Sequence, residues 1–120
     1  MMILSKKEKL LKIDVVEEKM KKTLKGKPTL IDLWANWCGP CHAIAPTVHN
    51  LEAIYEGKLN VLQIDVDTEE GNAVFMAMAI PYDYNAIPYL IVFDKDGNEF
   101  DHLVGADPNR LTKMVEQVMK

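Results

Sequence analysis

The chain has 120 residues, of which 48% are hydrophobic and 27% charged, and this size and composition support one hydrophobic core and therefore one domain. No uncharged apolar stretch approaches the roughly 20 residues that a transmembrane helix needs, and the apolar residues 1–4 precede the first lysines, whereas a secretory signal has the opposite order. We therefore expect a cytoplasmic protein without a membrane span.

Positive charge is concentrated in the N-terminal segment. Residues 1–27 contain nine lysines and four acidic residues, a net charge of +5, so the rest of the chain carries −9. These lysines alternate with glutamates along a predicted amphipathic helix over 15–24, capped by Asp14, and residues 1–13 form a basic extension or a first strand. We interpret the lysines as a solvated helix face rather than a nucleic-acid-binding surface, because no aromatic residues interleave with them and Arg110 is the single arginine.

The middle of the chain alternates between predicted strands and helices. An apolar run with β-branched and aromatic residues predicts a buried strand over 29–35. Apolar residues at helical spacing predict a helix over 38–55, which Pro46 should kink. A second strand over 59–65 and a helix rich in Ala and Met over 68–79 follow.

The C-terminal part predicts a hairpin and a last helix. A buried strand over 89–93 is joined to a returning strand over 98–104 by a turn that contains Asp-Gly. The last helix begins at Pro108, is capped by Asp107, and has an apolar stripe made of Leu111, Met114, Val115 and Val118. This order of elements predicts an α/β fold in a single domain over 1–120.

The two cysteines carry the clearest chemical signal. Cys38 and Cys41 are separated by Gly39 and Pro40 and lie between a predicted strand and a predicted helix. Unpaired backbone N–H groups and the helix dipole stabilise a thiolate at a helix N-terminus, so we expect Cys38 to be the nucleophile. Cys41, one turn further along and more buried, would attack the mixed disulfide that Cys38 forms with a partner.

Three other roles of the pair fit the sequence less well. Free cysteines are often inert core residues, although the two-residue spacing at a helix start argues against this here. Structural zinc needs four ligands, and the other candidates, His42, His49 and His102, have the spacing of no standard zinc finger. Cys38, Cys41 and His42 also satisfy the C-x-x-C-H pattern of covalent haem attachment, which a visible absorption spectrum would test.

The sequence WANWCGPC at residues 34–41 resembles the active-site motif of the thioredoxin family. The resemblance covers about residues 14–119, with Ile-Ala-Pro at 44–46, Ile-Pro at 87–88 before a strand and Val-Gly-Ala at 104–106 before the last helix. It implies a thioredoxin fold, in which a central mixed β-sheet is flanked by α-helices. It also implies a protein-disulfide oxidoreductase that exchanges its Cys38–Cys41 disulfide with partner proteins, mainly as a reductant, and needs no metal or other cofactor.

The resemblance assigns further roles. Asp32 looks like the family's buried carboxylate, which exchanges a proton with the resolving cysteine, here Cys41. Pro88 looks like its cis-proline, and the backbone of Ile87 would pair with an extended segment of the partner. Trp34 would pack beneath the active-site loop. The groove around the sulfur of Cys38 would be formed by Trp37, Gly39, Pro40, Ile87, Pro88, Gly105 and Ala106.

The same resemblance implies partners: a thioredoxin-reductase-like protein or another dithiol donor, and target proteins that contain disulfides, with the chain itself a monomer. A binding module with the thioredoxin fold, in which redox activity is incidental, is the alternative.

The chain departs from the family pattern in two places near the expected site. Gln63 stands where many members have a lysine near the buried carboxylate, so Asp32 should titrate higher than is usual. Tyr89 follows the expected cis-proline in place of the common threonine, so the groove should be narrower or more aromatic.

The segment before the expected cis-proline is longer than in typical members and contains Ala-Ile-Pro-Tyr twice, at 79–82 and 86–89. Either Pro81 or Pro88 can be the cis residue, and we favour Pro88 because a strand follows it directly. The tyrosines of this segment, Tyr82, Tyr84 and Tyr89, either recognise a partner or simply pack.

The three histidines receive separate predictions. His42 occupies a place where the family often has a lysine, and it is either a solvated residue or a source of positive charge near Cys38. His49 and His102 are expected to have no catalytic role.

Overall fold

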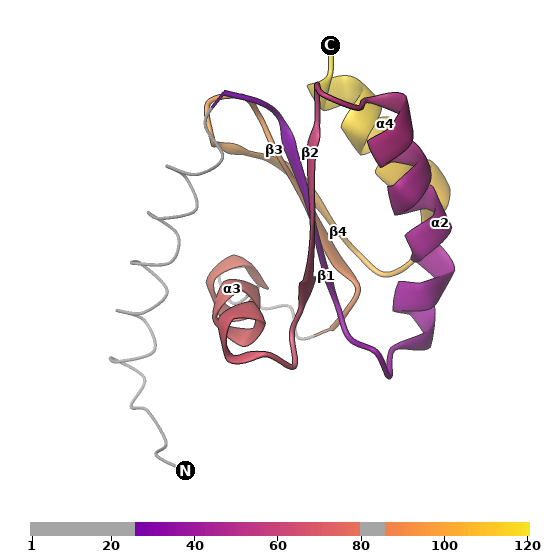
Figure 1. Ribbon diagram of the computed structural model, residues 1–120, viewed down its shortest axis with the longest axis vertical. Coiled ribbons are helices and arrows are strands. Elements are labelled where there is room, and N and C mark those ends of the chain that lie inside the picture. The colour runs from indigo at the N-terminus through magenta and orange to yellow at the C-terminus, as the bar shows by residue number, and fades with distance from the viewer. Residues whose placement is uncertain (1–25, 80–85) are drawn as a thin grey trace.

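The computed structural model describes residues 26–79 and 86–120, which form a four-stranded mixed sheet between helices (Figure 1). The strands lie in the order β2-β1-β3-β4; β1 pairs with β2 in parallel, and the pairs β1–β3 and β3–β4 are antiparallel. The elements are β1 (Thr29–Trp34), α2 (Gly39–Ile54), β2 (Asn60–Asp65), α3 (Glu69–Ala79), β3 (Tyr89–Phe93), β4 (Glu99–Val104) and α4 (Pro108–Val118).

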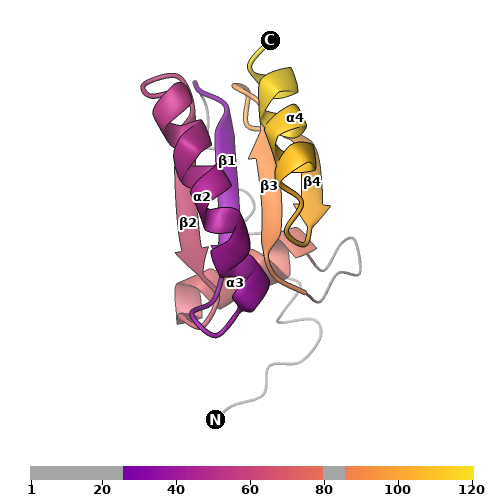
Figure 2. The ribbon, with the colours of Figure 1, turned by 90° about the vertical axis from the view of Figure 1, so that its right-hand side faces the viewer.

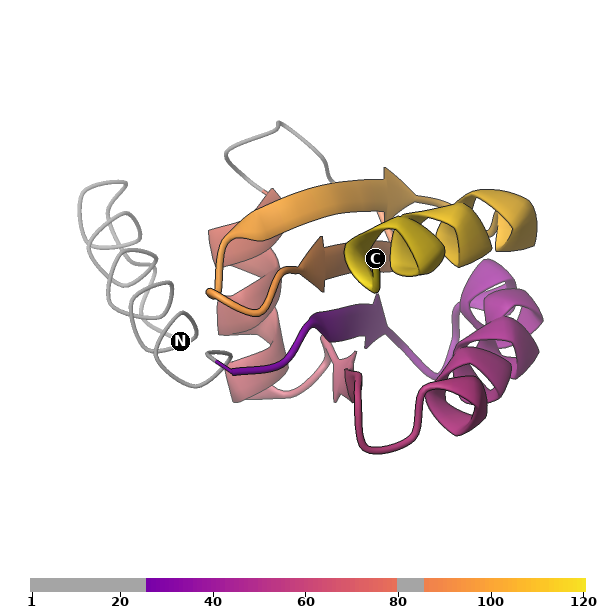
Figure 3. The same cartoon turned by 90° about the horizontal axis from the view of Figure 1, so that it is seen from above.

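Helices cover both faces of this sheet. α2 and α4 lie side by side on one face, and α3 lies on the other (Figures 1, 2 and 3). Successive side chains of a strand point to opposite faces, so β1 sends Leu30 toward α2 and α4, while Ile31 and Leu33 pack on the α3 side. Because both faces are covered, β1 reads as a continuous apolar run instead of an alternating pattern.

The same alternation places Asp32. It has the parity of Leu30 and therefore lies on the face that α2 covers. In the parallel register Asp32 is opposite Gln63 of β2. A carboxyl group thus interrupts an otherwise apolar layer, beside the helix that carries both cysteines.

The predicted elements of the described residues are confirmed to within about a residue at each end. α2 runs through Pro46 without ending there, and Gly57 follows it with a positive φ of 79°. α4 begins at Pro108 behind the cap Asp107, as predicted. Among the described residues no helix is long and apolar enough to cross a bilayer.

Some predictions concern residues outside the described ranges. These are the helix over 15–24 with its cap Asp14, the segment 1–13, and the residues Pro81, Tyr82 and Tyr84.

Candidate active site

A disulfide joins Cys38 and Cys41 at the N-terminus of α2, with their Cα atoms 5.3 Å apart. Cys38 is the N-cap, with extended backbone angles, and its Sγ accepts the backbone N–H of Cys41 at 3.2 Å. Pro40 lies in the first turn, where its missing N–H costs nothing, and this turn contains no acidic side chain. The Sγ of Cys38 therefore sits where backbone donors and the helix dipole stabilise negative charge.

Both cysteines are nearly buried in this disulfide state. Cys38 is 4% exposed and Cys41 is 3% exposed, so the predicted difference in burial between them is wrong for the oxidised protein. The bond holds the two sulfurs together in one small cluster with Ala35, against which Trp34 and Ile87 also pack. The residues that surround the sulfur of Cys38 therefore limit how a partner can approach it.

The segment before β3 forms one wall of the site. The peptide bond between Ile87 and Pro88 is cis, as predicted for this proline. The carbonyl oxygen of Ile87 lies 3.8 Å from the Sγ of Cys38. Gly105, with a positive φ of 100°, donates its N–H to the carbonyl of Pro88 at 2.9 Å. The start of α2, the loop before β3 and the end of β4 thus meet at one place.

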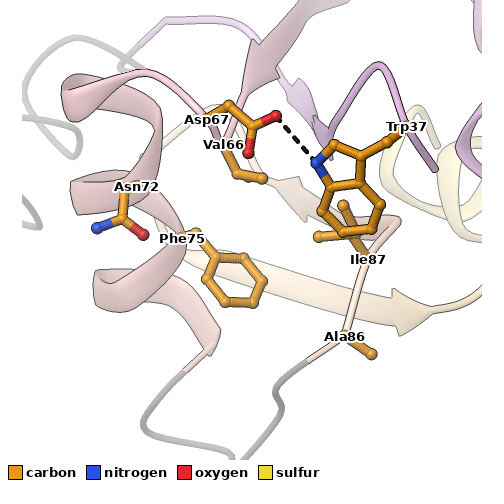
Figure 4. Close-up of a pocket in the computed structure, with 7 residues that line it drawn as sticks. All are labelled: Trp37, Val66, Asp67, Asn72, Phe75, Ala86 and Ile87. Carbon is orange, nitrogen blue, oxygen red and sulfur yellow. Dashed lines mark hydrogen bonds between the residues drawn. The ribbon is translucent and has the colours of Figure 1, made fainter.

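Trp37 lines a hollow together with Ile87, a residue that packs against the cysteine cluster (Figure 4). The side chain of Trp37 is 71% exposed, and the indole Nε1–H donates to Oδ2 of Asp67 at 3.0 Å. The hollow, about 460 Å³ in volume, is lined by Trp37, Val66, Asp67, Asn72, Phe75, Ala86 and Ile87. The sequence predicted Trp37 and Ile87 as binding residues but missed those that come from the end of β2 and from α3.

A network of local hydrogen bonds positions Asp67 between β2 and α3. Oδ1 of Asp65 accepts the N–H of Asp67 at 2.9 Å. The hydroxyl of Thr68 donates to the carbonyl of Asp65 at 2.8 Å and accepts the N–H of Gly71 at 2.9 Å. A Cβ at Gly71 would collide with the Asp65 carbonyl, so this turn requires glycine there.

Asp32 is almost completely buried, with 1% of its surface exposed. Its Oδ2 accepts a long hydrogen bond of 3.5 Å from Nε2 of Gln63, and its Oδ1 has no partner among the described residues. Desolvation raises the pKa of Asp32 above its ordinary value, and the bond from Gln63 and the positive charge of His49 oppose this effect only in part. Whether this pKa also exceeds that of family members with a lysine at the position of Gln63 stays a prediction.

Tyr89 does not line the groove, and this prediction from the sequence is wrong. The side chain is fully buried on the α3 face of the sheet, its ring meets Phe75 edge to face at 6.4 Å, and its hydroxyl donates to the carbonyl of Met78 at 3.1 Å. The alternation of β3 sends Tyr89 away from α2, to the same side as Ile91.

His42 and Trp34 lie together beside the start of α2. Nε2 of His42 lies 2.8 Å from the carbonyl of Asn36, so this nitrogen carries the proton and donates. The ring of His42 meets the ring of Trp34 edge to face, with 6.4 Å between centroids. Trp34 packs against the cysteine cluster, as predicted.

The other predicted binding residues differ in exposure. Gly39, Pro40 and Ala106 are exposed, and Pro88 is buried. Their contact with a partner stays a prediction. Among the described residues, no group of three or more His, Cys, Asp or Glu side chains is arranged to hold a metal ion.

Comparison with known proteins gives concordant matches. A family model described as Thioredoxin matches residues 5–117. Thioredoxins from several strains of Staphylococcus aureus are 47% identical over 79 residues, which is 66% of this chain and 69% of theirs. The X-ray structure of Fasciola hepatica thioredoxin aligns with a TM-score of 0.65 at 32% identity, covering 83% of this chain and 88% of that one. A crystal structure of Malassezia sympodialis thioredoxin aligns with a TM-score of 0.68 at 30% identity, covering 87% and 88%.

Proposed function

Because this chain belongs to the thioredoxin family, we propose that it acts mainly as a reductant of disulfides in partner proteins. Its activity as a thiol-disulfide oxidoreductase follows from the family and from the Cys38–Cys41 disulfide. The mechanism rests on the position of the Cys38 Sγ. This atom caps α2, accepts the N–H of Cys41 and lies next to the carbonyl of Ile87.

The first step is nucleophilic attack by the thiolate of Cys38 on a disulfide of the partner. One sulfur of the partner forms a bond to Sγ of Cys38, and its other sulfur leaves as a thiolate, which takes up a proton. Backbone N–H donation at the helix start favours the thiolate form that this attack requires.

The second step releases the partner. Cys41 loses its thiol proton to the carboxylate of Asp32, attacks the Sγ of Cys38 and breaks its bond to the partner, whose bound sulfur leaves as a thiolate and takes up a proton. This step leaves the Cys38–Cys41 disulfide and a partner with two reduced sulfurs, so two electrons pass to the partner. A buried carboxyl with a raised pKa is suited to accept a proton near neutral pH, which supports this role for Asp32.

The partner docks at the loop before β3. An extended segment of the partner would pair with the backbone of Ile87, next to the sulfur of Cys38, in the manner of an added strand. The hollow between Trp37 and Phe75 would take an apolar side chain of that segment. Partners of this family are in general proteins with disulfides and a reductase, and a thioredoxin-reductase-like protein or another dithiol donor would restore the thiols here.

The remaining predictions concern the setting of the reaction. Electrons would enter by contact with a protein dithiol, without a metal or other dissociable cofactor. The cytoplasmic location and the monomeric state stay predictions from the sequence.

Trapping of mixed disulfides tests this function. In Cys41→Ser the first step should proceed and the second should fail, so partners should accumulate in covalent complexes that a thiol reagent releases. The double variant Cys38→Ser/Cys41→Ser is the control and should trap nothing. If instead the double variant retains the same partners without a covalent bond, the chain is a binding module and the proposed exchange with those partners is wrong.

A further inference from the structure

A chain of polar side chains connects the buried Asp32 with the solvent. Nε2 of Gln63 donates to Oδ2 of Asp32 at 3.5 Å, and Oε1 of Gln63 lies 3.3 Å from Nε2 of His49. An amide oxygen only accepts, so Nε2 of His49 must be the donor. His49 is exposed, whereas Asp32 is 1% exposed, so the chain runs from the protein surface into the core.

Three separate elements bring these residues together. Asp32 is on β1, Gln63 lies opposite it on β2 in the parallel register, and His49 is on α2. α2 also carries Cys41, two turns before His49, and packs on the face of the sheet to which Asp32 points. A proton donor at the surface and the predicted proton acceptor of the site are therefore linked through one amide.

The direction of the two hydrogen bonds matches one pair of charge states. With its oxygen toward His49, the Gln63 amide presents its NH₂ group to Asp32, which favours the ionised carboxylate. A protonated imidazole strengthens this arrangement, because it donates a charged hydrogen bond to the amide oxygen. A neutral imidazole gives the carboxylate less support. Histidine commonly gains or loses its proton between about pH 5 and 8, where such a link would respond to pH.

We propose that His49 is a positioning residue that acts through Gln63 to favour the ionised carboxylate of Asp32, and so makes release of the partner by Cys41 dependent on the protonation of His49. The inference rests on the proposed role of Asp32 as proton acceptor, and it adds His49 as the residue that adjusts the ionisation of Asp32. A lysine at residue 63 would place a positive charge next to Asp32 at every physiological pH. Here His49 would supply that charge through Gln63, and only when its imidazole is protonated.

Among residues 26–79 and 86–120, few other charged groups surround Asp32 and His49. α3 packs on the opposite face of the sheet, β2 contributes Asp65, whose Oδ1 accepts the N–H of Asp67, and α2 contributes Cys41 in its first turn. On the solvent side of α2, Glu52 and Glu56 line with His49 a hollow at the outer edge of β2. The layer between β1, β3, α2 and α4 is otherwise apolar, formed by Leu30, Ile44, Val48, Leu51, Leu59, Leu90, Val92, Leu111, Met114 and Val115.

The titration of Asp32 tests the link directly. The carboxyl carbon of Asp32 would be followed by carbon-13 NMR against pH in the oxidised protein. His49→Asn keeps a donor beside Gln63 but removes the charge, and it should move the titration midpoint of Asp32 upward. The same substitution in a Gln63→Leu background should move the midpoint less, because the connecting amide is gone. An unchanged midpoint in His49→Asn would overturn the proposal.

An exchange of two neighbouring residues is the matched control. The double variant His49→Asn/Asn50→His keeps composition and charge but turns the imidazole by about 100° around the helix, away from Gln63. Both positions are exposed, so the fold should persist, which an unfolding curve checks. We expect this variant to titrate like His49→Asn. Recovery of the wild-type midpoint would show that a nearby charge suffices, and that the amide link is wrong.

Kinetics separates this inference from the function on which it rests. Single-turnover reduction of a disulfide peptide, under conditions where the second step limits, should be roughly two- to fivefold slower in His49→Asn at mildly acidic pH, the scale of one partly exposed charge. The difference should vanish at alkaline pH, where the imidazole is neutral. Equal slowing at every pH would contradict the proposal. If Asp32→Asn leaves the second step unchanged, the role of Asp32 itself fails; if Asp32→Asn slows it and His49→Asn does not, only the role of His49 fails.

Discussion

The two helices on one face of the sheet begin in the same way and do different things. At α2 the Sγ of Cys38 accepts the N–H of Cys41 at 3.2 Å, and at α4 the Oδ1 of Asp107 accepts the N–H of Arg110 at 3.1 Å. Both caps have an extended backbone, both helices have a proline in the first turn, and neither first turn contains an acidic residue. The two helix starts therefore share the same capping geometry and the same preference for a negatively charged capping atom.

The differences lie in the capping atom and in what surrounds it. Asp107 is exposed, and the neighbouring contact is an ion pair between Arg110 and Asp101 at 3.8 Å, with both side chains substantially exposed. Cys38 is nearly buried, and Ile87 reaches its sulfur from a distant part of the chain. A helix start that stabilises a carboxylate at α4 supports a reactive thiolate at α2, where the carbonyl of Ile87 also lies next to the sulfur.

The largest effect is expected when the capping atom of α2 is changed while the cap is kept. Cys38→Ser retains an N-cap acceptor for the N–H of Cys41, so the reduced variant should keep its helix content and fold. Disulfide reduction should fall by at least about a thousandfold, because serine offers no thiolate. Circular dichroism and a disulfide-peptide assay measure the two properties. Substantial remaining reduction would mean that Cys41 attacks partners on its own.

The next effect concerns Asp32, the buried carboxyl group on the sheet face that α2 covers. Asp32→Asn should slow release of the partner by at least about tenfold near neutral pH, because Cys41 loses its proton acceptor. Quenched-flow measurement of the mixed disulfide gives the rate. A rate equal to that of the wild type would show that solvent takes the proton.

The same variant should change stability with a definite dependence on pH. Because burial raises the pKa of Asp32 in the folded protein, ionisation favours the unfolded chain, and its cost is fully present above the folded pKa. Asp32→Asn should therefore raise the free energy of unfolding at alkaline pH. The gain should disappear as the pH falls below the ordinary carboxyl pKa of 3.8, where both states are protonated. Urea unfolding of the oxidised proteins at several pH values measures it.

The smallest effect is expected at the start of α4. Asp107→Ala removes the acceptor for the N–H of Arg110 and should lower the free energy of unfolding by about 1 kcal/mol. Disulfide reduction should stay at the wild-type rate, because no described contact joins Asp107 to the cysteine cluster. Asp107→Ser is the control and should recover most of the stability. Loss of reduction in Asp107→Ala would show that the two helix starts are coupled.

Local sequence patterns were sufficient to predict the elements of the described residues and the reactive cysteine pair. Periodicity, capping residues and turn residues act over a few positions, so the strand before Cys38, the helix after it and the cap at Asp107 could be predicted from neighbours in the chain. The motif at residues 34–41 also identified the family and, with Asp32 and Pro88, the residues expected to act.

Most contacts between distant side chains could not be predicted from the sequence. The resemblance already placed Gln63 near Asp32, and the register between β1 and β2 agrees, but the packing of α2 brings His49 to Gln63, and the turn before α3 brings Asp67 to Trp37. Tyr89 looked like a groove residue because of its place after Pro88, but the alternation of β3 buries it on the other face. Such contacts depend on sheet order and on which face is covered, and these arise from packing across the whole chain, so no local pattern encodes them.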